Sequence, residues 1–238
     1  MEKYSIAGLK VEADYHFKRM KTNMPRYLAD WDGEPDLKIN VPKNESLGLQ
    51  DGNPHLTADD CEYMLAAKQF YHQIVEHDAV MLHASAIVMD GVAYLFSARS
   101  GTGKSTHTQL WLKLFGTDRA YILNDDKPAI RIIDGAAYAC GTPFSGKSDL
   151  NVNKVVPLKA ICFIERSENN FIERMGVHNA LPNIMNQTIH SANEDYLQKS
   201  LHIIEKIIEL TPIYRLGCNI STDAAQLAHD VMSGEREI

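Results

Sequence analysis

Apolar residues in the middle of the chain fall into short extended runs that turn residues separate. Asp90-Gly91 and Asp134-Gly135 are pairs that suit the two-residue turn of a β-hairpin. We therefore expect two hairpins with a helix and a further strand between them. The predicted segments are the strands Val80–Met89 and Val92–Phe96, a helix over about Lys104–Phe115, the strand Ala120–Leu123, and the strands Ala129–Ile133 and Ala136–Ala139.

The last third of the chain changes from a strand pattern to a helix pattern. Leu158–Ile164 is predicted to be a buried strand, and Phe171–Val177 is a possible partner for it. Glu194–Leu210 has apolar residues on one face, which predicts an amphipathic helix. The other elements expected here are a helix over about Ala180–His190, a short strand Ile213–Leu216, and a final helix to about Met232 that Ser221 or Thr222 caps.

The first 57 residues alternate extended runs, such as Tyr4–Ala13 and Leu37–Val41, with turn-rich stretches. This pattern predicts a small β-rich N-terminal lobe over residues 1–57. Thr57-Ala58-Asp59-Asp60 can cap a helix that runs to about His77. We expect this helix to lead into a second, larger domain over residues 58–238.

Composition and charge narrow the classes of function. The 238 residues are 45% apolar and 23% charged, which is ordinary for a globular protein. A formal net charge of −7 argues against general binding to nucleic acid or anionic membranes, because both need clustered Lys and Arg. No apolar run approaches the roughly 20 residues that cross a bilayer, and the N-terminus lacks the pattern of a signal peptide, so we expect a cytoplasmic protein. The four Cys show no C-x-x-C pairing and are expected to be free thiols.

The strongest motif is the segment Ala98–Ser105, which matches the phosphate-binding pattern G-x-x-x-x-G-K-[ST] except that Ala98 replaces the first glycine. It follows an apolar strand and opens a helix, so backbone N–H groups and the helix dipole face one concavity. Lys104 would reach the β- and γ-phosphates, and Ser105 would ligate Mg²⁺. The residues expected to bind ATP are Ser100, Gly101, Thr102, Gly103, Lys104, Ser105 and Thr106.

Asp125 and Asp126 directly follow the strand Ala120–Leu123 and Asn124, at the edge of the sheet where ligands collect in α/β proteins. Neighbouring residues on an extended chain point to opposite faces, so we expect different roles for the two carboxylates. One would face Mg²⁺ and the other the acceptor hydroxyl or water. Alone, the pair would more simply begin a turn, but the phosphate loop about twenty residues upstream favours a joint site.

Three segments together resemble the catalytic domain of HPr kinase/phosphorylase, a bacterial serine kinase. They are Leu82-His83-Ala84-Ser85, Ser100–Ser105 and Leu123-Asn124-Asp125-Asp126. The chain is more similar still to HPr-kinase-related proteins that share an H-A, S-G-T-G-K-S-T, N-D-D-K-P and G-T-P-[FW]-S-G-K succession. The likeness covers roughly residues 81–164.

The resemblance implies an α/β (α+β) fold with a P-loop core and a mixed sheet, as in ATP-dependent phosphoenolpyruvate carboxykinases, with the N-terminal lobe and C-terminal helices added. It also implies that His83 lies near the phosphates, that Asp125 acts as general base and that Asp126 supports Mg²⁺. The residues alone favour an ordinary half-buried strand histidine at position 83, and only the resemblance makes a role for His83 in the site about as well supported. HPr kinase forms hexamers, so a homo-oligomer is possible.

One difference from the HPr kinase sequence concerns the segment expected to bind the molecule that accepts the phosphate. HPr kinase has an R-G-[LI]-G-type segment downstream of the aspartates, where this chain has Gly141-Thr142-Pro143-Phe144-Ser145-Gly146-Lys147. This segment could close over the triphosphate or bind the acceptor, with Lys147 following the phosphate charge, or it could be a surface turn. Both interpretations stay open, and phosphorylation of HPr itself is not expected.

The leading hypothesis is a Mg-ATP-dependent kinase that transfers the γ-phosphate to a hydroxyl of a protein serine or a small molecule. Its catalytic residues would be Asp125, Lys104, His83 and Lys147, and Ser105 and Asp126 would hold Mg²⁺. The alternative is a nucleotide-binding accessory protein of a biosynthetic or peptide-modifying pathway, without transfer activity. A phosphoenolpyruvate carboxykinase activity is a weaker hypothesis. The chain is much shorter than those carboxykinases and shows no recognisable oxaloacetate-binding arginine cluster.

Overall fold

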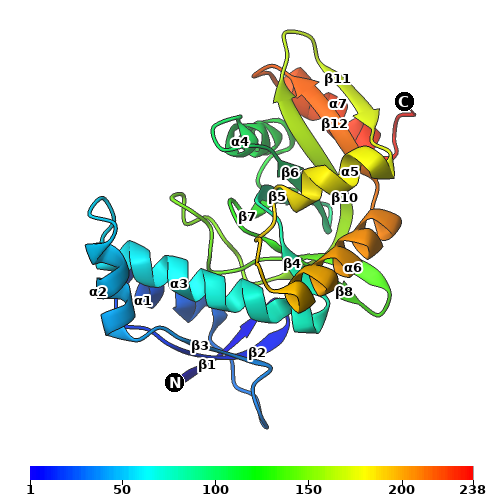
Figure 1. Cartoon of the computed structure of the whole chain (residues 1–238). Helices are drawn as coiled ribbons and strands as arrows, with labels where there is room; N and C mark the ends of the chain where they lie inside the picture. The colour runs from blue at the N-terminus through cyan, green and yellow to red at the C-terminus, as the bar shows by residue number, and fades with distance from the viewer. Residues whose placement is uncertain (238) are drawn as a thin grey trace.

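Two sheets organise the protein, and the computed structural model describes residues 1–237 of it (Figure 1). The small sheet contains β1 (Glu2–Ile6), β2 (Leu9–Asp14) and β3 (Leu37–Asn40). The run that we expected as one strand is a β1–β2 hairpin, because Ala7 and Gly8 take positive φ values of 54° and 73°. β3 then pairs with β2 in parallel.

The N-terminal segment contains helices as well as strands, which its extended runs did not predict. α1 (Lys18–Asn23), a 3₁₀ turn (Met24–Tyr27) and α2 (Lys43–Asp51) connect or follow the strands. α3 (Ala58–Gln73) then begins at the predicted cap, where the Thr57 hydroxyl accepts a hydrogen bond from Asp60 N and the Asp60 carboxylate accepts one from Thr57 N. The 3₁₀ turn Ile74–His77 ends this helical stretch.

α3 packs across the small sheet in Figure 1 and shares its hydrophobic core. Phe70 and Tyr71 of α3 are in this core together with Tyr4, Val11 and Ile39 of the three strands. The division of the chain at residue 57 stays a prediction.

The large sheet has nine strands and a mixed topology. Its main path runs β4-β8-β9-β10-β6-β5-β7, and β12 pairs with β10 while β11 pairs with β12. The strands are β4 (Ala79–Met81), β5 (Ala84–Met89), β6 (Val92–Ser97), β7 (Ala120–Asn124), β8 (Ala129–Ile133), β9 (Ala136–Cys140), β10 (Val155–Arg166), β11 (Phe171–Arg174) and β12 (Ile213–Cys218). Both predicted hairpins are present, as β5–β6 and β8–β9.

Two strand predictions were wrong. The run Val80–Met89 is interrupted at Leu82-His83, so β4 pairs with β8 whereas β5 pairs with β6 and β7. The partner of β11 is β12, not β10, because β12 occupies the edge of β10 by parallel pairing. In both cases the competing pairing comes from a distant part of the chain.

β10 connects the two halves of the large sheet. Its first residues, Val155–Pro157, pair with β9, and the remainder lies between β6 and β12, parallel to both. Because β5 is antiparallel to β6 and to β7, the strands β6, β7, β10 and β12 end at one edge of the sheet. The segments that carry the candidate chemistry leave the sheet at this edge.

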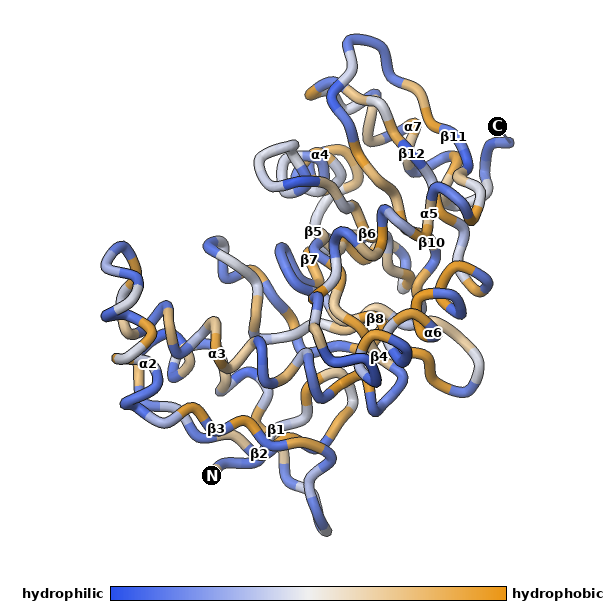
Figure 2. Tube along the Cα trace, viewed as in Figure 1, coloured by the Kyte–Doolittle hydropathy of each residue, from blue (hydrophilic) through white to orange (hydrophobic). Residues whose placement is uncertain are grey.

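Helices cover both faces of the large sheet. α5 (Val177–Met185) and α6 (Glu194–Leu210) pack on one face, and α4 (Lys104–Phe115) and α7 (Thr222–Ser233) pack on the other. Ala86 and Val88 of β5 face the first pair of helices and Ile87 and Met89 face the second, so the strand is buried on both sides. Figure 2 shows this as apolar colour on the strands between the helices.

The helix boundaries match the sequence pattern where capping or periodicity is strong. α4 and α6 have the predicted bounds, and Ser221 caps α7 by accepting a hydrogen bond from Ala224 N. No helix within residues 1–237 is long and apolar enough to cross a membrane.

Candidate functional site: a phosphate loop beside two aspartates

The phosphate loop joins β6 to α4 in the context that the motif requires. Gly101 and Gly103 have φ values of +77° and +124°, which side chains rarely adopt, and an added Cβ at either position would meet nothing within 4 Å. These glycines are therefore needed for backbone conformation. Gly103 is the N-cap of α4 and makes no side-chain cap, so the first N–H groups of the helix are available to an anion.

Lys104 extends from the first turn of α4 into the protein and is only 8% exposed. Its ammonium donates to Ala98 O at 3.0 Å and lies 3.2 Å from His83 Nε2. Burial lowers the pKa of Lys104, and the negative charges of Asp126 and Asp125 oppose this shift. The charge is thus held next to both aspartates with little water around it.

His83 connects Lys104 to Asp126. The same Nε2 lies 3.3 Å from Asp126 Oδ1, and Nδ1 lies 3.0 Å from Gln187 Oε1. The backbone of His83 also donates to Gln187 O at 2.8 Å. The break between β4 and β5 therefore places the imidazole at the edge of the sheet, with its ring orientation fixed by the segment after α5.

Asp126 is held as a carboxylate. It contacts His83 on one side and forms an ion pair with the Lys127 ammonium on the other. Burial acts to raise the pKa of Asp126, but the His83 contact and the charge of Lys127 outweigh burial and hold the pKa at about 2. A carboxylate that stays ionised is a good ligand for a hard cation and a poor proton acceptor.

The contacts of Asp126 with His83 and Lys127 make part of the stability sensitive to acid. The folded pKa of Asp126, about 2, lies below the ordinary value of 3.8, so the contribution is complete above pH 4 and is lost as the pH falls through 2. It amounts to at most about 2 kcal/mol, and roughly half should be gone at pH 3. Urea unfolding of wild type and Asp126→Asn at pH 5 and pH 3 measures this contribution to the free energy of unfolding. The variant has no carboxylate at position 126 and should not lose this part of its stability at pH 3. Asp118→Asn, at an exposed turn, should keep the wild-type dependence on pH; equal pH dependence in all three proteins would contradict the assignment.

Asp125 contacts a different set of partners from Asp126, although both residues lie in a bend after β7 and not in a strand. Its Oδ1 accepts a hydrogen bond from Ser85 Oγ at 2.6 Å, and Ser85 Oγ lies 2.8 Å from Thr108 Oγ1. Thr108 Oγ1 also lies 3.1 Å from Ser105 O. These contacts connect Asp125, which directly follows β7, to the first turn of α4, where Ser105 and Thr106 are exposed.

Asn124 fixes the backbone that carries the aspartates. It is fully buried, and its Oδ1 accepts hydrogen bonds from Asp126 N at 3.0 Å and Lys127 N at 2.8 Å. Its Nδ2 donates to Thr142 O at 2.9 Å, and Thr142 Oγ1 donates to Lys127 O at 2.8 Å. Tyr71 of α3 also donates to Lys127 O. The turn after β7 is thereby attached both to the segment 141–147 and to the N-terminal part of the chain.

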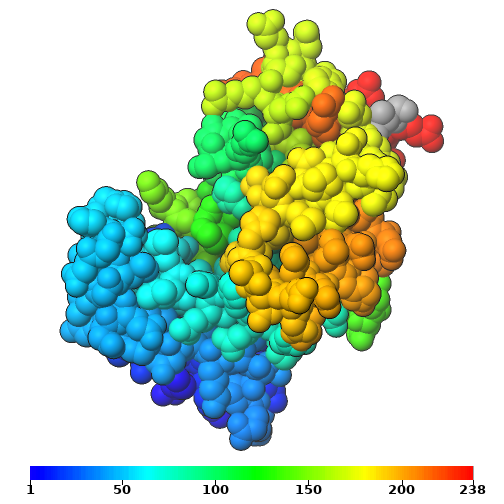
Figure 3. All heavy atoms as spheres, in the orientation of Figure 1, coloured from blue at the N-terminus to red at the C-terminus, as the bar shows by residue number. Residues whose placement is uncertain are grey.

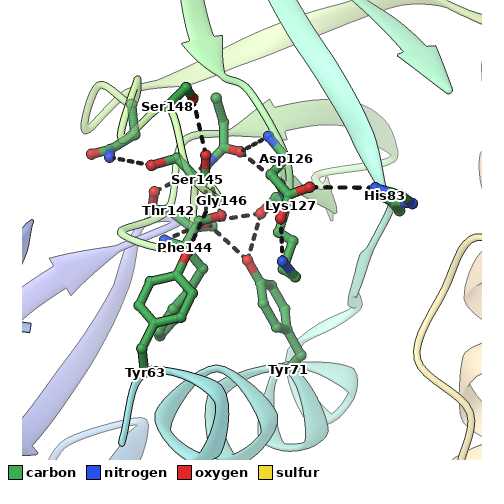
Figure 4. Close-up of polar contacts among 12 residues, drawn as sticks. Tyr63, Tyr71, His83, Asp126, Lys127, Thr142, Phe144, Ser145, Gly146 and Ser148 are labelled. Atoms are coloured by element: carbon green, nitrogen blue, oxygen red, sulfur yellow. Dashed lines mark hydrogen bonds and ion pairs between the residues drawn. The ribbon is translucent and has the colours of Figure 1, made fainter. Parts of the chain in front are cut away.

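The segment 141–147 lies directly against Asp126 (Figure 4). Gly146 has φ +69°, and a Cβ there would be 2.9 Å from Asp126 Cβ and Cγ. Its N–H donates to the Tyr63 hydroxyl at 3.0 Å, and its carbonyl accepts from the Arg19 guanidinium. In Figure 3 the chain after β9 borders a hollow between the helices α2 and α3 (blue to cyan) and α4 (green).

Lys147 lies apart from the other predicted site residues. It is exposed and lines a cavity of about 450 Å³ with residues of α1, among them Arg19 and Asn23, and with Asp149. The structure therefore brings together the loop, Lys104, His83, Asp125 and Asp126, and Gly146 is the member of the segment 141–147 that reaches them.

Arg166 is a candidate that the sequence motifs did not reveal. It ends β10, and its guanidinium donates to Gly101 O at 2.7 Å and approaches Thr102 O at 3.5 Å. β10 pairs with β6 in parallel, with Phe163 opposite Ser97, so both strands deliver their next residues to the same place. Only this pairing, which joins segments over sixty residues apart, could have identified Arg166; Ser85 and Gln187 were missed for the same reason.

Two cavities meet at the phosphate loop. One, of about 560 Å³, has apolar walls from Leu110, Ile164 and Ile220. The other, of about 940 Å³, is polar and is lined by arginines and by carboxamide side chains near the end of α5. Gly101, Thr102 and Arg166 border both cavities. A ligand seated on the loop would thus have an apolar compartment on one side and a polar compartment on the other.

Comparison with known proteins gives a distant likeness of fold. No protein-family model matches the chain, and no curated protein is similar to it. Among solved structures, the HPr(Ser) kinase/phosphatase from Coxiella burnetii is similar at a TM-score of 0.38 and 11% identity. The match covers 63% of this chain and 94% of that chain. The likeness concerns a mixed α/β fold alone.

Proposed function

We propose that the protein is a Mg-ATP-dependent phosphotransferase that transfers the γ-phosphate to a hydroxyl group of a protein serine or a small molecule. One observation carries the proposal: His83 Nε2 lies 3.2 Å from the Lys104 ammonium and 3.3 Å from Asp126 Oδ1. The Lys104 ammonium and the Asp126 carboxylate therefore both contact the same imidazole nitrogen. Phosphoryl transfer depends mainly on such positioned charges.

The residues around this point fit a magnesium nucleotide. Ser105 offers a hydroxyl oxygen and Asp126 an ionised carboxylate, which are the donor types that Mg²⁺ takes besides phosphate oxygens and water. Bound Mg²⁺ would neutralise phosphate charge. Lys104 and the N–H groups of the loop would hold the phosphates, and Arg166 would add a planar cation on the open side of the loop.

The two cavities at the phosphate loop would hold different parts of the nucleotide. The apolar cavity, with Leu110, Ile164 and Ile220, would take the nucleobase. His107 borders this cavity, and burial lowers its pKa to about 4, so its ring is neutral at ordinary pH. The triphosphate would then cross the loop at Gly101 and Thr102 toward Lys104.

Asp125 is proposed as the group that accepts the proton of the attacking hydroxyl. Of the two aspartates, Asp125 is the one whose carboxylate makes no ion pair within residues 1–237. A single hydroxyl, that of Ser85, donates a hydrogen bond to it. A base in this position contributes typically 10²–10⁴-fold to the rate.

The test is transfer from γ-labelled ATP to hydroxyl-bearing metabolites and to proteins of a cell extract. We expect one labelled acceptor with wild type, and with Asp125→Asn a loss of about 10²-fold or more in turnover at similar nucleotide affinity. Asp118→Asn removes an exposed carboxylate in the turn before β7 and should transfer normally. Tight binding of Mg-ATP without any labelled product would contradict the proposal and favour the accessory protein.

A further inference from the structure

The C-terminal end of α7 lies against the end of α4 that is remote from the phosphate loop. His229 of α7 is 6% exposed. Its ring lies 5.5 Å from that of Trp111, 4.8 Å from that of Phe115 and 6.4 Å from that of Tyr94, centroid to centroid. The twelve residues of α4 span about 18 Å, so this place is distinct from the phosphate site. Three aromatic neighbours fix the plane of the imidazole and the direction of its nitrogens.

One of these nitrogens, Nδ1, is buried and makes no hydrogen bond to any group of residues 1–237. A buried polar atom without a partner destabilises the folded chain unless a ligand satisfies it. Its neighbours are two carboxylate oxygens, Asp230 Oδ1 at 3.5 Å and Glu235 Oε2 at 3.9 Å. All three atoms lie within 4.8 Å of one another.

These separations are close to those between the ligands of a tetrahedral metal ion. With metal–ligand bonds of about 2.0–2.2 Å, the ligand atoms of such a site lie roughly 3.4 Å apart. A direct charge-assisted hydrogen bond would instead bring nitrogen and oxygen to about 2.7–2.9 Å. The observed gaps around Nδ1 are longer than a hydrogen bond, and they leave room for an ion between the three atoms.

The backbone at the end of α7 positions both carboxylates. Gly234 has φ +89°, and Arg236 N donates to Asp230 O at 2.8 Å, so the chain turns back and returns Glu235 to the helix end. Asp230 Oδ1 accepts a hydrogen bond from Gln226 Nε2 at 2.6 Å, which orients that carboxylate. The C-terminal end of a helix also carries a partial negative charge, which favours a cation.

We propose that His229 Nδ1, Asp230 and Glu235 bind a divalent transition-metal ion of the zinc class, with a fourth position open to water. An imidazole nitrogen with carboxylate oxygens suits Zn²⁺, whereas Mg²⁺ prefers oxygen ligands alone. The ion would join Glu235, which follows α7, to the last turns of that helix. This site does not depend on phosphoryl transfer, and it is the only group of three such ligands that residues 1–237 contain.

Cobalt substitution tests the site. Metal-free full-length protein is titrated with Co²⁺, because tetrahedral Co²⁺ absorbs visible light far more strongly than octahedral Co²⁺. We expect strong absorption that saturates at one equivalent and is abolished by Zn²⁺, and a higher melting temperature with Zn²⁺. Absence of a tetrahedral spectrum in wild type would overturn the proposal.

Variants assign the spectrum to residues. Glu235→Gln changes an exposed side chain, so it should fold normally and bind Co²⁺ about tenfold more weakly or worse. His229→Gln should lose the spectrum. Glu205→Gln, an exposed charge on α6, and Asp126→Asn should both retain it. Equal Co²⁺ binding by Glu235→Gln, His229→Gln and Glu205→Gln would show that the ion binds elsewhere and would overturn the proposal.

Discussion

Lys104→Ala lowers phosphoryl transfer by about 10²–10³-fold or more, if the proposed function is correct. The ammonium is 8% exposed and lies beside His83, so it acts where little water screens its charge. Its loss removes the buried cation of the loop, which is proposed to follow charge onto the γ-phosphate. Turnover of γ-labelled ATP and nucleotide affinity, measured on the same protein samples, test the prediction.

Lys113→Ala is the matched control for this variant. Lys113 lies on the same helix but is exposed, so its removal should leave transfer and nucleotide affinity unchanged. Thermal unfolding of both variants separates a lost charge from a lost fold. Unchanged affinity together with unchanged turnover in Lys104→Ala would refute the assignment of the phosphate loop.

Gly141→Ala should destabilise the protein by about 3 kcal/mol or more. A Cβ at this position would lie 1.8 Å from Val152 O and 3.2 Å from Leu123 O, both of them backbone atoms that cannot rotate away. Gly141 N also donates to Lys154 O at 2.9 Å, so the chain is held in this close approach. Chemical denaturation at neutral pH gives the difference in unfolding free energy.

Gly176→Ala serves for comparison, because its added Cβ would meet nothing within 4 Å and its φ is −75°. We expect a change of at most about 1 kcal/mol there. If Gly141→Ala is as mild as Gly176→Ala, the packing of the segment after β9 against the end of β7 is not as close as described.

Local signals predicted the elements near the phosphate loop well. Gly103 and Lys104 mark the start of α4, and the two Asp-Gly turns mark the hairpins, because glycine and turn chemistry act over a few residues. The same reasoning placed the aspartates at the end of β7.

Contacts between distant parts of the chain place the site residues that local sequence signals did not predict. Arg166 reaches the loop only because β10 pairs with β6, and Gln187 reaches His83 across 104 positions of sequence. Neither contact leaves a pattern of spacing along the chain. The segment 141–147 shows the same limit: its glycines and Lys147 suggested phosphate contacts, yet Gly146 approaches Asp126 while Lys147 faces α1.

The two contacts of His83 Nε2 exclude each other. This nitrogen either carries a hydrogen that it gives to Asp126, or offers a lone pair to the Lys104 ammonium. A phosphate that draws Lys104 toward itself would free the nitrogen to bind Asp126. The imidazole would then act as a relay, through which the Asp126 carboxylate, the proposed metal ligand, senses whether the nucleotide site is filled.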